Sequence, residues 1–154
     1  MHRDRSSPIA GLRRPESVLV VVYTDAGKIL LLNRIMPFEF WQSVTGSLDP
    51  GESSLHAARR ELEEETGLTE EGDLIDCGLT RTFEIDLRWR DRYPPGVTEN
   101  REHEWRYRVC APIDVIANPA EHGAWKWLDI DEAIDAVWSW TNREALENLR
   151  QDLS

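Results

Sequence analysis

Two runs of aliphatic and β-branched residues open the patterned part of the chain. Residues 17–24 and 28–34 are apolar at nearly every position, and an Asp-Ala-Gly turn sequence separates them. The pattern predicts a β-hairpin whose strands are largely buried on both faces. After an interruption that contains Pro37, a further short strand is expected over 42–45, stopped by Gly46.

A helical period replaces this pattern after the next loop. Leu55, Ala58 and Leu62 recur at the spacing of one helix face, which we expect to face the core. Gly67 stands where a residue in the left-handed conformation often ends a helix. The sequence therefore predicts a helix over 53–66.

The second half of the chain continues with three strands and two helices. The strands are expected over 74–86, 102–111 and 124–128. A helix is expected over 131–138, and Thr141 with Glu144 forms a capping-box signature that opens another. The apolar face of that last helix holds Ala145, Leu146, Leu149 and Leu153. This order of elements predicts a mixed sheet.

Length and apolar content are typical of a single globular domain. The 154 residues suit one domain, expected over 13–154, after a flexible polar lead-in over 1–12. The longest apolar run, 18–23, is far shorter than the roughly 20 residues that cross a bilayer. The basic N-terminus is not followed by the apolar segment of a secretory signal, so a cytoplasmic location is expected. Cys77 and Cys110 lack zinc-site spacing and are expected to be buried, reduced thiols.

The net charge of −11 narrows the range of partners. Asp and Glu number 29, whereas Lys and Arg number 18. We do not expect such an acidic chain to bind nucleic acid or an anionic membrane through its overall field. A phosphorylated small molecule stays compatible with this charge, because a divalent cation can join protein carboxylates to phosphates.

Glutamates are concentrated on the predicted helix. At about 100° per residue, Glu61, Glu64 and Glu65 share one side of it. Like charges three and four residues apart repel one another, and Mg²⁺, which prefers oxygen ligands, would offset that repulsion. Arg60 borders this face, and Glu52 lies where the helix begins. A solvated acidic face would explain the helix alone, but the glycines of the preceding loop let backbone approach a ligand and favour a functional site.

The loop and the helix together resemble the signature box of the Nudix hydrolases. That box has Gly, Glu, Arg-Glu-aliphatic, Glu-Glu and Gly-aliphatic at fixed spacing, and this sequence matches all nine positions over 23 residues. Such a match arises by chance with a probability on the order of 10⁻⁶. The matching residues are Gly46, Glu52, Arg60, Glu61, Leu62, Glu64, Glu65, Gly67 and Leu68.

The resemblance implies both a fold and a chemistry. The fold is α/β (α+β), with a mixed β-sheet sandwiched between helices and a loop-helix-loop motif that carries the metal site. The chemistry is hydrolysis of a nucleoside diphosphate linked to another group, with Mg²⁺ as cofactor and Mn²⁺ able to replace it. By the same resemblance Glu61 and Glu65 ligate the metal, Glu64 is a further ligand or a base, and Glu52 and Arg60 support them.

Segments outside the box are similar to one branch of the family, which converts dihydroneopterin triphosphate to the monophosphate and pyrophosphate in folate biosynthesis. They include residues 40–47, 74–77, 92–98 and 126–128. This similarity implies that Glu121 is a third metal ligand and that eight further residues contact the substrate. These are Arg13, Arg34, Thr45, Phe83, Glu84, Ile85, Asp86 and Ser139.

The side chains of this set leave some roles open. A guanidinium offers a fixed fork of donors, which suits Arg13 and Arg34 to phosphate. Phe83 is expected either to stack on the pterin or to pack in the core, and Asp86 stands where the branch has an apolar residue. The same choice between pocket wall and packing applies to Trp41, Trp125, Trp127, Trp138 and Trp140.

The expected partner is a small triphosphate, with no nucleic acid, membrane or obligate protein partner. Two alternatives stay open. One is a Nudix pyrophosphohydrolase of (d)NTPs or modified nucleotides, and the other is a non-catalytic Nudix-like nucleotide-binding module. The complete set of Glu61, Glu64 and Glu65 argues against the second, because a module that only binds does not need it.

Overall fold

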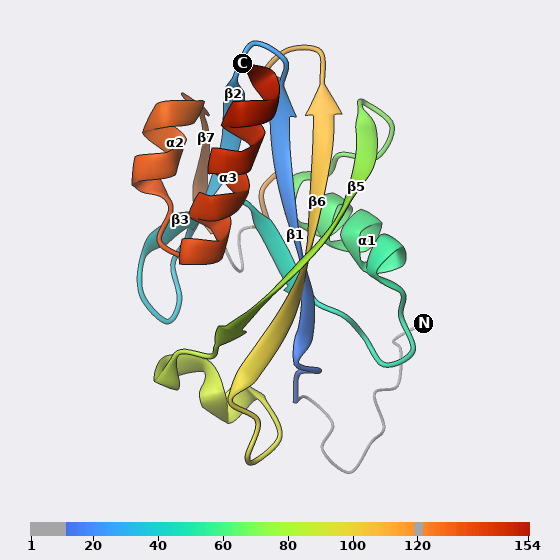
Figure 1. Cartoon of the computed structure of the whole chain (residues 1–154), viewed down its shortest axis with the longest axis vertical. Coiled ribbons are helices and arrows are strands. Elements are labelled where there is room, and N and C mark those ends of the chain that lie inside the picture. The colour runs from blue at the N-terminus through green and yellow to red at the C-terminus, as the bar shows by residue number, and fades with distance from the viewer. Residues whose placement is uncertain (1–11, 119–121) are drawn as a thin grey trace.

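Across residues 12–118 and 122–154, which the computed structural model describes, the strands form one seven-stranded sheet (Figure 1). They are β1 (Glu16–Thr24), β2 (Lys28–Arg34), β3 (Phe40–Gln42), β4 (Val44–Ser47), β5 (Asp73–Glu84), β6 (Glu99–Val109) and β7 (His122–Asp129). The main path of the sheet runs β3-β2-β1-β6-β5, while β4 pairs with β1 and β7 pairs with β2. Only the β1–β6 pair of these described strands is parallel, which confirms the mixed sheet.

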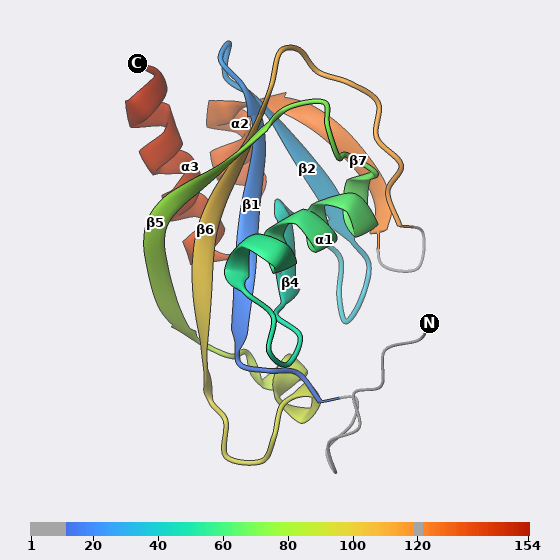
Figure 2. The ribbon, with the colours of Figure 1, turned by 90° about the vertical axis from the view of Figure 1, so that its right-hand side faces the viewer.

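Helices cover both faces of this sheet, as the view in Figure 2 shows. The covering helices are α1 (Ser54–Thr66) on one face and α2 (Ile130–Ala136) with α3 (Trp140–Leu153) on the other, while the short 3₁₀ helix η1 (Leu87–Arg92) lies beyond the end of β5. One apolar core lies between α1 and the sheet, and a second lies between the sheet and the α2–α3 pair. The expected sandwich of a mixed sheet between helices is therefore confirmed. Within the described residues, no helix is long and apolar enough to cross a membrane.

The predicted hairpin forms, but its strands diverge soon after the turn. β1 and β2 pair at Tyr23 and Ile29. Farther along, β4 pairs with residues 17–20 of β1, and β3 pairs with residues 32–34 of β2. Because β6 and β7 occupy the outer edges of β1 and β2, the β3–β4 segment must fill the gap between them. The expected strand over 42–45 is thus two short strands, and Gly46 lies inside the second.

The helix that carries the glutamates has the predicted ends. The Ser53 side chain accepts the N–H of His56, and Gly67 closes the helix at φ 78°, in the left-handed region that glycine tolerates. One prediction about its faces is wrong, because Leu55 is 41% exposed. The buried side instead includes Ala57 beside Ala58. The buried face of the helix therefore lies closer to the glutamates than the predicted apolar face does.

Other boundaries differ from the sequence-based expectation. β5 ends at Glu84, and Asp86 caps η1 by accepting the N–H of Arg88, where the sequence predicted a continuous strand. The cap of α3 is Ser139, two residues before the predicted Thr141, and its hydroxyl accepts the N–H of Asn142. The expectation of two buried thiols is also wrong. Both cysteines are free, but Cys77 is half-buried and Cys110 is exposed.

A buried polar contact fixes the start of α3 against the gap-filling segment. Asn142 accepts the backbone N–H of Ser43 at 2.8 Å, and its amide donates to the Ser43 hydroxyl at 3.0 Å. Both residues are almost fully buried. Because Ser43 joins β3 to β4, this contact ties the second helical layer to the centre of the sheet.

We expect Asn142→Ala to lower the free energy of unfolding by about 2 kcal/mol, because it leaves a buried backbone N–H without its acceptor. Urea unfolding at neutral pH measures this loss. Asn148→Ala, on the same helix but only half-buried, is the matched control and should cost less than about 0.5 kcal/mol. Equal stabilities of the two variants would contradict this role of Asn142.

Candidate active site

A cleft of about 670 Å³ lies between the start of α1, the gap-filling strands and the start of α3. This volume is in the range of small-molecule sites. β1 and β6 supply part of its wall, and the β5–η1 segment closes another side. All eight residues expected to contact a substrate line this one cleft, although they come from five separate stretches of the chain. They are Arg13, Arg34, Thr45, Phe83, Glu84, Ile85, Asp86 and Ser139.

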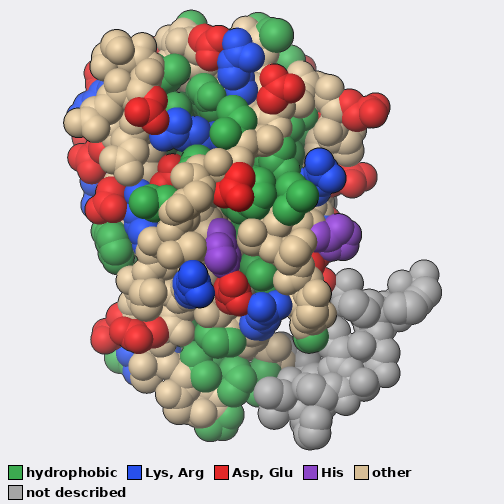
Figure 3. Space-filling view, turned by 45° about the vertical axis from the view of Figure 1, so that its right-hand side comes forward, with side chains coloured by type: hydrophobic (Ala, Val, Ile, Leu, Met, Phe, Trp, Pro, Cys, Tyr) green, Lys and Arg blue, Asp and Glu red, His purple; other side chains and the backbone are tan. Residues whose placement is uncertain are grey.

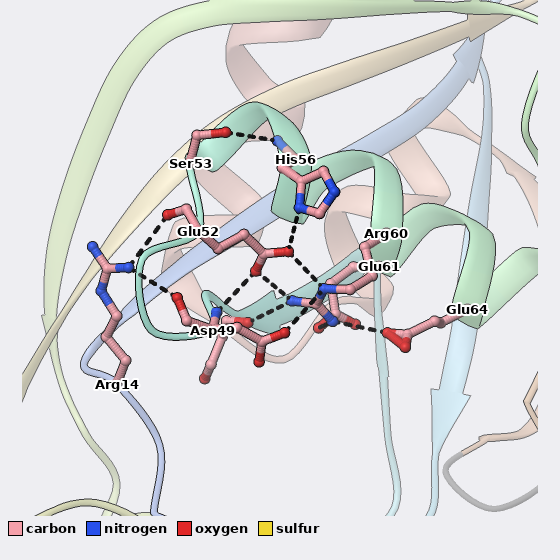
Figure 4. A network of polar contacts seen from close by, with 9 residues as sticks. Arg14, Asp49, Glu52, Ser53, His56, Arg60, Glu61 and Glu64 are labelled. Atoms are coloured by element: carbon pink, nitrogen blue, oxygen red, sulfur yellow. Dashed lines mark hydrogen bonds and ion pairs between the residues drawn. The ribbon is translucent and has the colours of Figure 1, made fainter. Parts of the chain in front are cut away.

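The guanidinium of Arg60 is the centre of the polar network shown in Figure 4. Its Nε and Nη2 donate to the two carboxylate oxygens of Glu52, each at 2.8 Å, so the pair is bidentate. Its Nη1 donates to Glu64 at 2.8 Å and to Glu61 at 3.0 Å. Nη2 also donates to the carbonyl of Ser47 at 3.0 Å. One side chain therefore connects the loop before α1 to two glutamates on α1.

Glu52 is held inside the loop rather than turned toward the cleft. It accepts the backbone N–H of Asp49 at 2.8 Å and contacts the ring of His56 at 2.9 Å. Burial opposes its ionisation, but the hydrogen bonds from Arg60 outweigh that effect and lower the pKa of Glu52 to about 2. Its position agrees with the supporting role expected for Glu52 and Arg60.

Arg14 is a further constraint on this loop that the sequence analysis did not single out. Its Nη1 donates to the carbonyls of Asp49 at 3.1 Å and Glu52 at 3.3 Å, as Figure 4 shows. Its Nη2 pairs with Glu16 at 2.6 Å, at the start of β1. Adjacent Arg13 lines the cleft and donates its backbone N–H to Arg92. The two neighbouring arginines thus have different surroundings, which residue type alone does not reveal.

Glu61 and Glu65 lie on the inward side of α1. The Glu61 side chain is only 14% exposed and lies against Gly46, where any added methyl group would overlap its carboxylate. Burial raises the pKa of Glu61, while a side-chain hydrogen bond with Glu65 and the charge of Arg60 act in the opposite direction. Glu65 itself is 2% exposed. The expected glutamate face is therefore partly buried and not a solvated surface.

These carboxylates fit a divalent cation in part. Glu61 and Glu65 place hard oxygen donors of like charge together in a shielded position, which is the donor set that Mg²⁺ prefers. Glu64 is half-exposed and paired with Arg60. Glu121, the expected third ligand, lies outside the described residues. Within the part of the chain that is described, no group of three or more His, Cys, Asp or Glu side chains is already arranged as a metal site.

A cluster of aromatic rings contributes Phe40, Trp89 and Trp138 to the wall of the cleft. Phe38, Phe40, Trp89 and Trp138 contact one another with ring centroids 4.9 to 5.8 Å apart, and Phe38 also receives the Arg88 guanidinium at 3.9 Å. Of the tryptophans predicted either to line a pocket or to pack, Trp138 and Trp140 line the cleft. The others pack against the two cores, and they are Trp41, Trp125 and Trp127. Trp89 lines the cleft although the sequence analysis did not select it.

Glu102 is a buried acidic residue of the cleft that the sequence analysis missed. It lies on β6, is 6% exposed and lines the cleft beside Asn100. Burial raises its pKa to about 7, although a hydrogen bond with Thr141 and the charge of Arg81 act in the opposite direction. The available signal was the position of Glu102 in β6, because it shares one face of that strand with Asn100 and Glu104, while Trp105, Tyr107 and Val109 on the other face reach the apolar core.

Basic and acidic side chains are mixed on part of the surface outside the cleft. On the face shown in Figure 3, Lys and Arg side chains are interspersed with Asp and Glu side chains, so the basic groups do not gather into a patch there. With a net charge of −11, this distribution offers little attraction to a polyanion on that face. Positive charge is instead available inside the cleft, where Arg13 and Arg34 form part of the wall.

We expect Gly46→Ala to remove at least about 99% of any hydrolytic activity of this cleft, because the added methyl group displaces the Glu61 carboxylate. The circular dichroism spectrum should stay that of the native protein. Gly78→Ala is the matched control: alanine is strained at the left-handed φ of 66°, but its Cβ meets open space away from the cleft, so turnover should stay near the wild-type value. A Gly46→Ala protein with normal turnover would contradict the close packing of Glu61 on this strand.

Comparison with known proteins agrees with this arrangement. Residues 13–149 match the family described as NUDIX domain. Dihydroneopterin triphosphate diphosphatase of Escherichia coli (strain K12) is 44% identical over 139 residues, which cover 88% of this chain and 91% of that protein. The protein of the same name from Haemophilus influenzae is 35% identical over 144 residues, 88% of this chain and 90% of its own.

Solved structures give the same result. The structure of the E. coli dihydroneopterin triphosphate pyrophosphohydrolase superposes with a TM-score of 0.84 and 42% identity, covering 89% of this chain and 95% of that one. A C. elegans Ap4A hydrolase binary complex superposes with a TM-score of 0.70 and 27% identity, covering 90% and 96%. The complete glutamate box, the fold and these matches lead to one conclusion: the chain belongs to the Nudix family.

Proposed function

We propose that this protein is a Mg²⁺-dependent pyrophosphohydrolase that converts dihydroneopterin triphosphate to dihydroneopterin monophosphate and pyrophosphate. The observation that carries the proposal is the cleft that brings Glu61 and Glu64 of the box together with all eight expected substrate residues. Relatives named for this reaction are 44% and 35% identical over most of their length, which supports the choice of substrate.

Glu61 and Glu65, with Glu121 as the third ligand, would hold the metal, and Glu64 would be a further ligand or a base. When bound, Mg²⁺ would neutralise phosphate charge and lower the pKa of a coordinated water. Arg60 fixes Glu61 and Glu64 relative to the loop by direct hydrogen bonds. Gly46 leaves the space that the Glu61 carboxylate occupies.

The remaining residues would orient the triphosphate. Arg34 is 9% exposed, and its Nε donates to the carbonyl of Met36 at 3.0 Å, which fixes its guanidinium on the cleft wall. Together with Arg13, it would bind phosphate oxygens. A water molecule then adds to one phosphorus of the anhydride between the first and second phosphates. The bond to the bridging oxygen breaks, the water proton passes to a base, and pyrophosphate leaves.

A substrate panel tests the proposal. The purified protein is incubated with Mg²⁺ and, separately, dihydroneopterin triphosphate, dATP, 8-oxo-dGTP and ADP-ribose, and kcat/KM and the released phosphate species are measured. The proposal requires the pterin to have the highest kcat/KM, with pyrophosphate as product. A higher kcat/KM for a nucleotide would show that the proposed substrate is wrong and that the proposed chemistry is right. Binding of these compounds without turnover would show that the protein is a nucleotide-binding module and not an enzyme.

Glu61→Gln and Glu65→Gln are expected to lower kcat at least about 100-fold at saturating Mg²⁺, because each removes a charged metal ligand. Glu63→Gln is the matched control, since Glu63 is exposed on the same helix and should keep wild-type kcat. Steady-state kinetics with pyrophosphate detection measures the effect. Near-normal turnover in either Glu61→Gln or Glu65→Gln would refute its role as a ligand.

Arg34→Ala is expected to raise KM for the triphosphate about tenfold while kcat changes less than about threefold, because the lost contact is to substrate phosphate. Arg59→Ala, which removes an exposed arginine outside the cleft, should leave both constants unchanged. Calorimetric titration of substrate in the presence of Ca²⁺ separates binding from turnover. Unchanged binding by the Arg34→Ala protein would exclude Arg34 from the phosphate site.

A further inference from the structure

Glu102 occupies the floor of the cleft, away from the box glutamates. In the sheet register it lies between Ser17 of β1 and Arg81 of β5. Ser17 in turn lies opposite Ser47 of β4, next to the Gly46 that Glu61 packs against. Two strand spacings, about 10 Å, therefore separate the backbone at Glu102 from that at Ser47. This separation suits a ligand whose phosphates lie at Glu61 and whose ring lies at Glu102.

The surroundings of Glu102 do not use its full capacity to accept hydrogen bonds. The Thr141 hydroxyl donates to it, and Thr141 Oγ1 lies 3.0 Å from Ser139 Oγ. Arg81, the basic residue opposite, donates instead to Glu104 at 2.6 Å and to Glu144 at 2.8 Å. An ionised carboxylate offers about four acceptor positions. Capacity is left for donors that enter through the cleft.

Keeping this carboxylate here costs stability. The pKa of Glu102 is about 7, above the ordinary value of 4.5, because burial disfavours the charged form. The negative charge of nearby Glu104 raises the pKa further. The protein therefore loses stability as pH rises from about 4.5 to 7. A neutral amide of the same shape would avoid that loss. A buried charge that faces a cleft and is only partly satisfied is characteristic of a binding residue.

A flat ring is well accommodated beside Glu102. Phe83 lies on β5 opposite Asn100, two residues along from the Arg81–Glu102 pair, so its side chain is on the same face of the sheet as Glu102. Diagonal neighbours of this kind are about 7–8 Å apart, within reach of an aromatic side chain. Both residues line the cleft. A ring that stacks on Phe83 would present its edge to the Glu102 carboxylate.

We propose that Glu102 is the specificity-determining residue for the ring: its carboxylate accepts hydrogen bonds from the two adjacent N–H groups of a 2-amino-4-oxopyrimidine edge. Pterins present this edge, and guanine presents the equivalent one. Adenine presents an acceptor nitrogen beside its amino group, and at pH 8, where Glu102 is ionised, that nitrogen would face the carboxylate without a proton between them. Glu102 thus selects against adenine. This inference rests on the proposed function, because it assigns the ring end of the same substrate site.

The first test needs no variant. Wild-type protein is assayed with GTP and with inosine triphosphate, which lacks only the 2-amino group. Loss of one hydrogen bond to a charged acceptor corresponds to a kcat/KM for GTP at least about tenfold higher. Equal values would overturn the role of Glu102 whatever the natural substrate is. If neither compound is cleaved, calorimetry with Ca²⁺ measures their dissociation constants. Tighter binding of GTP supports the role of Glu102, and equal binding overturns it.

The second test is Glu102→Gln, because the amide offers one acceptor and places a donor against a ligand N–H. KM for dihydroneopterin triphosphate should rise about 10- to 100-fold, with kcat changed less than about threefold. The ratio of kcat/KM for the pterin to that for dATP should fall at least about tenfold. Glu99→Gln, on the same strand but exposed and outside the cleft, should change neither. An unchanged pterin-to-dATP ratio in folded Glu102→Gln protein would overturn the proposal.

Thermal unfolding shows that the variant is folded and separates binding from structural roles. The unfolding midpoint of Glu102→Gln should be higher than that of the wild type at pH 8, and this difference should shrink at pH 5, where the native Glu102 is protonated. A lower midpoint at both pH values would make Glu102 a structural residue and contradict the proposal. If wild-type protein fails to cleave the pterin but prefers GTP to inosine triphosphate, the proposed substrate is wrong and the role of Glu102 stands.

Discussion

The guanidinium of Arg60 is the interaction on which the geometry of the site depends. It binds both oxygens of Glu52, contacts Glu61 and Glu64, and donates to the Ser47 carbonyl. A guanidinium has five N–H donors in a rigid plane, so it fixes the positions of several acceptors at once. The loop before α1 and the first turns of α1 thereby become one unit. A single positive charge does not neutralise all these carboxylates, and the remaining negative charge favours a divalent cation.

The sheet determines where this unit can act. β1 and β2 diverge after Tyr23 and Ile29, and the strands β3 and β4 fill the gap between them. β4 carries Gly46 to the Glu61 carboxylate, while Asn142 attaches the start of α3 to the same segment through Ser43. Side chains from both helical layers therefore reach one cleft. The cleft wall thus combines acidic, basic, aromatic and buried polar side chains from separate elements.

Local sequence patterns were sufficient to predict many of the strands and helices. The hairpin strands, α1 with its Gly67 cap and the apolar face of α3 follow from local periodicity and capping, and the structure confirms them. The eight substrate residues came from resemblance, and all of them line the cleft. Their contacts with a ligand, and the metal set that includes Glu121, stay predictions.

What the sequence did not reveal depends on contacts between distant segments. The burial of Glu65 and exposure of Leu55 reflect how α1 is rotated on the sheet. Ser139 rather than Thr141 caps α3, and the Thr141 hydroxyl instead contacts Glu102 of β6 and the Ser139 hydroxyl. Glu102 itself looked like one polar residue of an alternating strand, and only the pairing of β6 with β1 brings it to the cleft.

The measurement that tests this account most directly is the kcat/KM of Arg60→Lys for dihydroneopterin triphosphate with Mg²⁺. Lysine keeps the positive charge but cannot make the planar set of directed contacts. If Arg60 positions the carboxylates, kcat/KM falls at least about 100-fold while the protein stays folded at the assay temperature. A kcat/KM within about twofold of the wild type would contradict the account, because charge alone would then suffice to organise the site.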